Sequence, residues 1–582
     1  SNIARLFRAY PDKDTKTGVY GFYIPGVATY FKEIGDDGGS TLGLLGGYKG
    51  EERLKWASDQ FDQALKVHIA RANNPANAIV EINIAAFGFS RGAALARAFI
   101  HRFVEKRCKE DTGGHWRLMP GGYRLRIRFM GLFDTVASVG PTMSTNNTSK
   151  VGALSGSLKY VIHSRLQDTS YALTRPERLA FSKHGQVLAD PAPGSFNGHS
   201  DWGNDMRIPE MVEEVRHFVA AHEIRNSFPV ESLSIMENGA ISKPAHFFEI
   251  VYPGVHSDVG GSYRPGEGAR SQNSADKIGL IPLSDMYKAA VAKGVPFVPT
   301  TAWTEYNVSD FEIYPQTINI HNYYLSQVVA PATLGGLFNA HMAIYYAWRF
   351  RAIHLKQKGD HSEADTVKKN EAIFQRDSKA LDKEIALLEQ ENNAALKKLG
   401  IARMDRQRYI NSQYGNPDVQ KGLPPYNQKI SDAQREQDLT QDKLLRAKAK
   451  KDALPGAGLQ EHLDFYDAQL LADADAIRKV CQSLPVGSTI IDPTIRQELR
   501  PHYRALLSAY ENEFIYNKGL KDVKVIDFFD HYVHDSLAGF AKDATLPSDP
   551  RVIYLGGNEK YKYARTEDGN RSMPTQEVSV LA

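Results

Sequence analysis

Apolar strands and amphipathic helices alternate along the first 140 residues of the chain. The run VEINIAAFGF at 80–89 is a β-branched apolar segment, and an alanine-rich stretch of helical character follows it. Residues 51–72 carry apolar side chains at helical spacing, whereas the runs 19–29 and 124–138 have the character of strands. Strands that alternate with helices predict a mainly parallel sheet, and the fold class is therefore α/β.

The strand pattern returns later in the chain, after two long intervals. A strand segment that ends in a glycine-rich loop covers 245–263, a short apolar segment covers 523–540, and RVIYLGG at 551–557 has the pattern of a closing strand. We therefore predict one core domain interrupted by two insertions. Its parts in chain order are core residues 1–140, a first insertion 141–240, core residues 241–300, a mostly helical second insertion 301–520 and core residues 521–582.

Both insertions are expected to act as caps over the core. Residues 209–228 of the first insertion have a helical pattern. In the second, apolar residues at alternating four- and three-residue steps predict an antiparallel helical hairpin or short coiled coil, with Asn392 interrupting its seam. The seam residues are Leu381, Ile385, Leu388, Ala395 and Leu399. The aromatic segment 337–353 is interpreted as a helix packed between cap and core, with a membrane-interface helix as the alternative.

Composition narrows the class of protein. The 582 residues are 42% hydrophobic and 24% charged, with a formal net charge of +3, which is typical of a soluble globular chain. No basic run dominates, so nucleic acid is not an expected partner. No apolar stretch approaches the roughly 18 residues that span a bilayer, and the start SNIARLFRAY lacks the apolar core of a signal peptide. Cys108 and Cys481 are expected to be buried free thiols.

The segment Gly-Phe-Ser-Arg-Gly at 88–92 joins the apolar strand to the alanine-rich helix. This strand, sharp turn and helix are the arrangement that presents a nucleophilic serine at the top of an α/β-hydrolase sheet. Ser90 is therefore the predicted nucleophile, held in a strained backbone conformation, and small residues are expected to be required at Gly88 and Gly92. Three small residues let the helix lie close to the sheet: Ala93, Ala94 and Ala96.

A serine hydroxyl needs a general base and a carboxylate that orients the base. Asp134 follows the next strand after the nucleophile and is the predicted acid, with Asp258 in the glycine-rich loop as the alternative. His534 lies just before the closing strand and is the predicted base, because chain order places the histidine of this fold last. His256, two residues before Asp258, is the alternative base.

Developing negative charge on the substrate requires two preorganised backbone N–H groups. The amide of Arg91, directly after the nucleophile, is one candidate. Gly26 or Val27, in a loop after an earlier apolar run, is the candidate for the other.

Metal or phosphate chemistry has little support in the sequence. His222 and Glu223 resemble a fragment of a zinc-binding helix, but the second histidine of such a helix is absent. The glycines around His256 lack a lysine at P-loop spacing. We expect a structural helix at 222–223, no catalytic metal and no cofactor.

Four linked segments carry a family resemblance: GFSRGAALAR, GLFDTV, PGVHSDVGG and YVHDSLAGF. Together they resemble the lipase effectors that bacteria deliver by type VI secretion, which share an α/β-hydrolase domain. The resemblance implies a Ser-Asp-His triad, which falls on Ser90, Asp134 and His534. It does not separate His534 from His256, because both motifs match.

The same resemblance implies an activity and partners. It implies hydrolysis of ester bonds in the membrane phospholipids of a competing cell, at that cell's periplasm or membrane. It further implies injection without a signal peptide, a secretion spike protein as carrier and a cognate immunity protein. In the family a strand ending in Asp-Gly-Thr usually precedes the first segment, so we expect part of the natural N-terminus, with a candidate oxyanion loop, to lie outside this chain.

Three functional hypotheses follow from the residues and the resemblance. The first is a lipolytic enzyme, whose caps open at a membrane surface. The second is another serine hydrolase, such as a soluble esterase, thioesterase or peptidase. The third is a non-catalytic binding protein that uses the helical cap, and the combination of nucleophile, acid and base argues against it.

Overall fold

The computed structural model describes most of the chain. The described residues are 1–38, 49–137, 139, 176–181, 198–329, 331–482, 495–536, 548, 551–555 and 562–564, with short gaps at 12–13, 15, 28, 200, 205, 226–227, 238–239, 332, 453 and 455–457.

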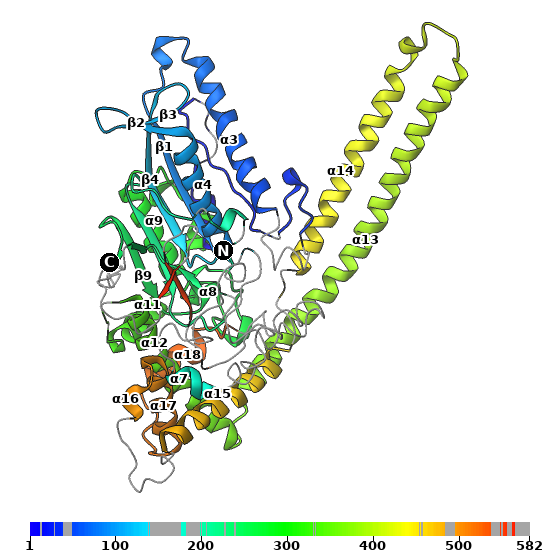
Figure 1. Cartoon of the computed structure of the whole chain (residues 1–582). Coiled ribbons are helices and arrows are strands. Elements are labelled where there is room, and N and C mark those ends of the chain that lie inside the picture. The colour runs from blue at the N-terminus through cyan, green and yellow to red at the C-terminus, as the bar shows by residue number, and fades with distance from the viewer. Residues whose placement is uncertain are drawn as a thin grey trace, which may run out of the picture.

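A mixed six-stranded sheet forms the centre of the fold (Figure 1). Four of its strands run parallel, in the spatial order β1, β4, β5, β9. They are β1 (Ile82–Phe89), β4 (Tyr123–Phe133), β5 (Val215–Ala220) and β9 (Phe247–Tyr252). Two short strands, β2 (Cys108–Glu110) and β3 (Trp116–Leu118), continue the sheet antiparallel beside the start of β4.

Helices cover both faces of the parallel strands, which explains why apolar side chains on both faces of those strands are buried. α4 (Arg91–Arg107) and α3 (Gly50–Arg71) pack on one face, and α1 (Asn2–Arg8) and α9 (Leu280–Ala292) pack on the other. The register of β1 against β4 shifts at Arg128, where one extra residue enters β4. Ile127, before the bulge, and Met130, after it, therefore both lie on the face of β4 that packs against α4.

Two elements predicted in the first half of the chain differ from the structure. The run 19–29 forms no strand: within it Val19 makes one isolated bridge, to Asp14, and the described residues from 20 to 27 have no regular structure. Residues 209–228 contain β5 instead of a helix, because Phe218 and its apolar neighbours are buried on both sides between β4 and β9. An apolar run buried on both faces has no period of two, and helical spacing fits it equally well.

The end of the chain also departs from the prediction. The segment that begins at residue 523 is a helix, α18 (Val523–His531). The expected closing strand exists as β10 (Ile553–Leu555), but it does not join the central sheet. It pairs with β6 (Val230–Glu231) and with β11 (Lys562–Ala564) in a separate small sheet.

The second insertion is helical, as predicted. Its elements include α10 (Glu305–Phe311), α11 (Pro315–Gln327), α12 (Leu334–Gln357), α13 (Ser362–Ser412), α14 (Pro424–Asp452), α15 (Leu459–Gln482) and α17 (Pro501–Phe514). α12 contains the aromatic segment 337–353, and it packs with α15, α17 and α18 in one apolar cluster. Its large side chains Trp348 and Phe350 are fully buried. This burial confirms the prediction of a packed helix and contradicts the alternative of a membrane-interface helix.

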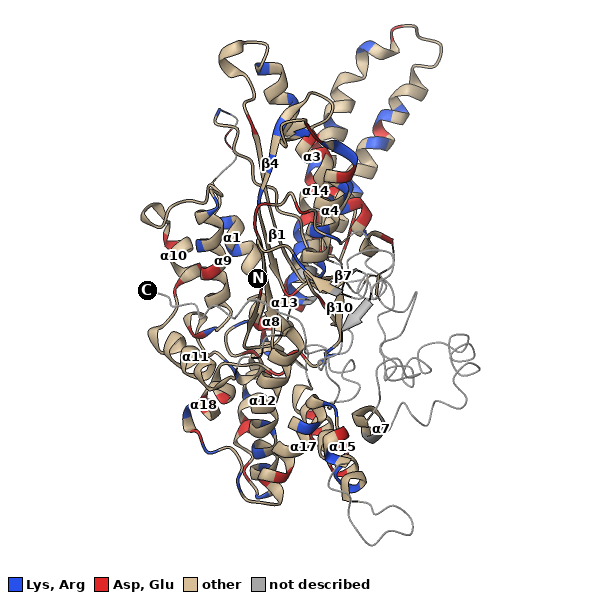
Figure 2. Cartoon of the chain, turned by 60° about the vertical axis from the view of Figure 1, so that its left-hand side comes forward, with Lys and Arg blue, Asp and Glu red and all other residues tan. Residues whose placement is uncertain are grey.

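α13 and α14 form the predicted antiparallel hairpin, which projects away from the sheet in Figure 1. Of the predicted seam residues, Ala395 and Leu399 are buried, whereas Leu381, Ile385 and Leu388 are half-buried. Asn392 is buried where it accepts a hydrogen bond from Thr440 at 3.1 Å. Basic and acidic residues both occur along the hairpin (Figure 2), and ion pairs such as Lys398–Glu436 at 2.6 Å join the two helices.

Two expectations about bulk properties can be compared with the described residues. No described helix combines the length and the hydropathy that a membrane span requires. Cys108 and Cys481 are both free thiols, as predicted, although Cys108 is half-buried and only Cys481 is buried.

Candidate active site

Ser90 lies at the sharp turn between β1 and α4. Its backbone has φ 60° and ψ −132°, a conformation that costs energy for a residue with a side chain. The surrounding backbone fixes this conformation, because the Ser90 N–H donates to the Phe133 carbonyl at 3.0 Å and the Ala93 N–H donates to the Ser90 carbonyl at 3.0 Å. The strained turn expected from the sequence is therefore present.

The two flanking glycines have different roles. A Cβ atom at Gly88 would lie 2.4 Å from the Ala93 Cα, so only glycine allows α4 to approach β1 this closely. A Cβ atom at Gly92 would meet nothing within 4 Å, so the steric requirement expected at Gly92 is wrong. The chain needs a small residue on the strand side of Ser90 and has open space on the helix side.

Asp134 follows β4 directly, beside Ser90. Its φ of 40° turns the chain at the strand end, and its N–H donates to the Phe218 carbonyl at 2.7 Å. The carboxylate is fully buried. Its Oδ1 accepts from the Ala220 N–H at 2.9 Å, and its Oδ2 accepts from His256 Nδ1 at 2.6 Å. Asp134 thus orients an imidazole, but the imidazole is that of His256.

His256 begins the short helix α8 (His256–Val259), which follows β9. Its ring lies between two aromatic rings, with centroid distances of 4.6 Å to Phe89 and 4.8 Å to Phe228. Phe89 is the residue immediately before Ser90. The backbone N–H of His256 donates to Glu223 Oε2 at 3.3 Å, which fixes the start of α8. Ser90, Asp134 and His256 therefore follow the carboxyl ends of β1, β4 and β9, where α/β sheets place ligands.

His534, the base predicted first, is paired elsewhere. Its Nδ1 donates to Asp258 Oδ1 at 2.6 Å, and its ring stacks on Tyr263 with a centroid distance of 3.8 Å. Asp258 and His256 are two residues apart on one helical turn, so their side chains leave it in roughly opposite directions, about 200° apart. The predicted combination of His534 with Asp134 is thus not the observed pairing: Asp134 pairs with His256, and Asp258 pairs with His534.

The charges around the Asp134–His256 pair favour a carboxylate and a neutral imidazole. Burial opposes the ionisation of Asp134, but the charge of Arg551 and the hydrogen bonds from His256 and Arg551 outweigh it and lower the pKa of Asp134 well below its usual value. Burial lowers the pKa of His256, although Asp134 acts in the opposite direction. A neutral imidazole with its Nδ1–H held by a carboxylate is the state that a general base requires.

The residues predicted for the oxyanion site lie around the first turn of α4. Arg91 is the first residue of α4, where backbone N–H groups point out of the helix end. Val27 is buried in one cluster with Ala94 and Leu95 of α4. The buried Arg53 side chain fixes the loop that contains Gly26 and Val27. It donates to the carbonyls of three residues of this loop: Pro25 at 2.9 Å, Gly26 at 2.9 Å and Thr29 at 2.9 Å.

The suspected zinc-helix fragment is not helical. His222 and Glu223 follow β5, so the expected helix is wrong there. His222 Nδ1 accepts from the Gly254 N–H at 2.9 Å, and Glu223 pairs with Arg225 through both oxygens. Among the described residues no group of three potential metal-ligating side chains is found. Both residues instead support the loop that leads into α8.

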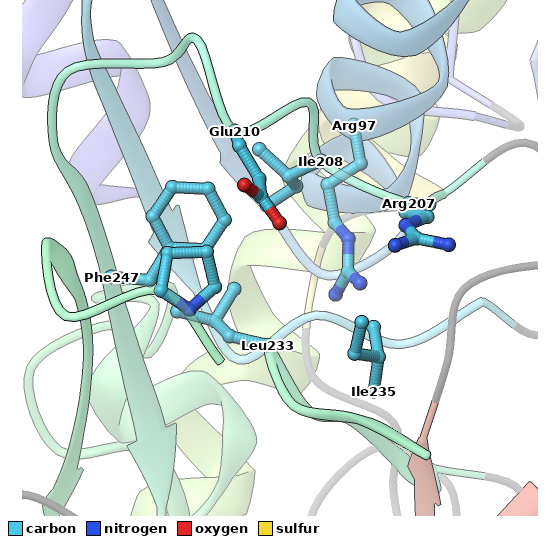
Figure 3. A pocket seen from close by; sticks show the side chains of 8 residues that line it. Arg97, Arg207, Ile208, Glu210, Leu233, Ile235 and Phe247 are labelled. Carbon is cyan, nitrogen blue, oxygen red and sulfur yellow. The ribbon is translucent and has the colours of Figure 1, made fainter. Parts of the chain in front are cut away.

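A surface pocket lies at the other end of the sheet (Figure 3). It is lined by residues such as Arg97 from α4 and Phe247, the first residue of β9. Since His256 follows the last residue of β9, this pocket is separated from Ser90 by the length of the strand. It is not part of the candidate active site.

Comparison with known proteins gives one family and a similar fold. Residues 104–289 match the family described as "T6SS, Phospholipase effector Tle1-like, catalytic domain". This segment is similar to the Tle1-like catalytic domain. The Tle1-like segment contains Asp134, His256 and Asp258, and it begins after Ser90 and ends before His534.

A solved structure described as an uncharacterized protein from Pseudomonas aeruginosa has a similar fold. It superposes with a TM-score of 0.58 at 19% sequence identity, over 97% of this chain and 77% of that one. A search of curated proteins finds no match.

One part of the site was not anticipated from the sequence. Arg551, at the start of β10, binds both carboxylate oxygens of Asp134. No local pattern marks it, because it is an ordinary charged residue before an apolar strand, 417 positions from its partner.

Proposed function

We propose that the chain is a serine phospholipase with an α/β-hydrolase core, which cleaves carboxylic ester bonds of membrane phospholipids. The nucleophile is Ser90, the general base is His256 and the orienting acid is Asp134. One observation carries this assignment. His256 donates to Asp134 at 2.6 Å while its ring lies against Phe89, the residue that precedes the strained Ser90.

The reaction follows from these positions. Ser90 Oγ attacks the acyl carbonyl carbon, and its proton passes to His256 Nε2 while Asp134 holds the opposite Nδ1–H. The tetrahedral intermediate collapses when the ester C–O bond breaks, and the leaving lysophospholipid alkoxide takes the proton from His256. Water then attacks the acyl-Ser90 ester with the same base, and the products are a fatty acid and the regenerated hydroxyl.

The developing oxyanion is held by the backbone N–H of Arg91 and by a second amide of the loop at Gly26 and Val27. The packing of Val27 against the first turns of α4 supports this placement. Removing one such donor typically costs about 10²–10³ in kcat, so the loop that Arg53 fixes contributes to catalysis through its rigidity.

The biological role in this proposal rests on the family of the matched segment, which is named for phospholipase effectors of type VI secretion. The enzyme is injected into a competing cell, carried by a secretion spike protein, and degrades that cell's membrane from its periplasm. A cognate immunity protein in the producing cell neutralises it.

Release of fatty acid from mixed phospholipid vesicles tests the proposal, with Ser90→Ala, His256→Ala and His534→Ala compared with the parent chain. Loss of turnover by about 10³-fold or more in Ser90→Ala and His256→Ala, with retention in folded His534→Ala, is expected. Loss in His534→Ala with retention in His256→Ala moves the base to the Asp258 pair. Full turnover in Ser90→Ala contradicts the enzyme mechanism.

A soluble serine esterase or thioesterase of the same fold is the alternative function. It predicts Ser90-dependent hydrolysis of short soluble esters by the parent chain without release of fatty acid from vesicles. The same assay, run with both kinds of substrate, therefore separates the two functions.

A further inference from the structure

Arg551 makes an unusually complete set of contacts with the candidate triad acid. Its Nη1 donates to Asp134 Oδ1 at 2.8 Å and its Nη2 donates to Asp134 Oδ2 at 2.7 Å. The remaining donors bind backbone, with Nη1 to the Ala220 carbonyl at 3.0 Å and Nε to the Phe228 carbonyl at 2.8 Å. The residue is only 6% exposed. Two parallel hydrogen bonds of this kind fix both the position and the plane of a carboxylate.

The C-terminal arm that carries Arg551 is attached to the core by backbone hydrogen bonds. Val230 donates to the Val552 carbonyl at 2.9 Å, and Ser232 donates to the Tyr554 carbonyl at 3.0 Å. β10 and β6 run parallel in this region. The Arg551 guanidinium therefore reaches Asp134 from a segment that follows the whole helical insertion in the sequence. The hydrogen bonds of the Asp134 carboxylate are incomplete until this segment has docked on the core.

We propose that Arg551 is a positioning residue for the reaction, which locks the Asp134 carboxylate toward His256 Nδ1 and limits how strongly that carboxylate holds a second proton on His256. This inference rests on the proposed function, because it assigns a role within the same triad. It makes the C-terminal arm a part of the active site.

The physical argument concerns the negative charge of Asp134. In a triad this charge stabilises the imidazolium that forms when Ser90 gives up its proton. The positive guanidinium on both oxygens reduces the field of that charge at His256, so less proton remains on the imidazole at rest. Orientation is gained at the same time, since one carboxylate plane satisfies both Arg551 and His256.

Other charged groups also face His256 and remain in place when Arg551 is changed. Glu223 accepts from the His256 backbone N–H, and Arg225 pairs with Glu223. Asp258, on the same short helix, points away from His256 and is engaged by His534. The effect of Arg551 is therefore measured against a constant background of Glu223 and Arg225.

The test is the pH dependence of the rate at which a small fluorophosphonate labels Ser90. It is measured for the parent chain, Arg551→Met and Arg551→Lys, and Ser90→Ala is the blank. In Arg551→Met we expect the acidic limb of the rate to move up by about one pH unit, because an opposing charge near the base has been removed. The plateau should fall about 10-fold. Arg551→Lys keeps the positive charge but loses the two parallel hydrogen bonds to Asp134. The plateau of the labelling rate should therefore fall, while the pH of the acidic limb stays unchanged.

Arg97→Met is the matched control. Arg97 is also buried and donates to backbone carbonyls, those of Met206, Glu231 and Ser232, but no contact with Asp134 is recorded for it among the described residues. We expect this variant to lose stability without moving the acidic limb. A limb that moves equally in both variants overturns the proposal, and so does an unmoved limb in Arg551→Met.

A double variant keeps the test decisive if Arg551→Met does not fold. Asp134→Asn with Arg551→Met removes both partners and leaves no unpaired buried charge, so it is expected to fold. If Arg551 positions Asp134, adding Arg551→Met to Asp134→Asn lowers the plateau by no more than about twofold, whereas the acidic limb still moves up because the guanidinium charge near His256 is removed. A further 10-fold loss shows a role independent of Asp134 and overturns the inference. Unchanged labelling in Ser90→Ala instead contradicts the proposed function itself.

Discussion

The two residues that directly follow β1 and β4 both have strained backbone conformations. Ser90 and Asp134 both have positive φ, at 60° and 40°, and they lie beside each other because Phe89 pairs with Phe133 in the sheet. Such conformations persist only where the surroundings fix them. Here the fixing contacts are backbone hydrogen bonds to the neighbouring strands, which places nucleophile and acid with little freedom.

The difference between the two elbow glycines gives a prediction at this scale. Gly88→Ala puts a Cβ atom 2.4 Å from the Ala93 Cα and forces α4 away from β1. We expect it to cost about 3 kcal/mol or more and to abolish labelling of Ser90. Gly92→Ala enters open space and is the matched control, with thermal unfolding within a few degrees of the parent. Equal unfolding midpoints for the two variants would contradict the account of the elbow.

Local sequence was sufficient for some site residues and insufficient for others. Ser90 and Asp134 were predicted because each directly follows an apolar strand. The partner of Asp134 could not be decided, because His256 and His534 each stand near an acid and chain order favours the later one. Only the direction in which α8 presents His256 and Asp258 separates the two pairs. Arg551 gives no local signal at all.

At the scale of elements, periodic segments were predictable and doubly buried ones were not. The seam of α13 and α14 was visible because every turn of a solvent-exposed hairpin must alternate apolar and polar residues. β5 was mistaken for a helix, because both of its faces are covered and its hydrophobicity carries no period. The strand predicted at 19–29 is absent for another reason. Arg53 donates to backbone carbonyls at the end of this run, in place of the hydrogen bonds that a neighbouring strand would have provided.

The hairpin gives a prediction about independence of elements. Its base contacts the core where Tyr30 donates to Asp442 at 2.9 Å, whereas its distal half is held by contacts between α13 and α14. Replacing residues 400–435 by a four-residue Gly/Asn linker should leave the hydrolysis of a soluble ester within about twofold of the parent. Steady-state kinetics and thermal unfolding of the two chains measure this. Collapse of core stability would contradict it.

At the scale of the whole molecule, a buried polar chain connects the caps to the active-site loop. His222 is hydrogen-bonded to the Gly254 N–H and to Tyr324, and Tyr324 is hydrogen-bonded to His341 at 3.0 Å. Burial lowers the pKa of His222 well below its usual value, that of His341 to about 3 and that of His321 to about 4. The interface between cap and core is therefore built on neutral imidazoles.

This has a consequence for stability against pH. Unfolded histidines bind a proton below about pH 6.5, whereas these stay neutral in the folded chain, so stability is fully present above that pH and is lost as the pH falls toward 4. His321 alone should account for about 2 kcal/mol between pH 7 and pH 5. Urea unfolding at both values is expected to show a smaller pH effect in His321→Leu than in the parent. The exposed His531 provides the control, His531→Gln, which should keep the parent's pH effect.

The central claim is that Ser90 carries an acyl group taken from a phospholipid. The most direct measurement is peptide mass spectrometry of the protein quenched during turnover on phosphatidylcholine vesicles. The account predicts one fatty-acyl mass added to the peptide that contains Ser90, and its absence in Ser90→Ala. Fatty-acid release with no acyl group on that peptide, or with the acyl group on another side chain, would contradict it.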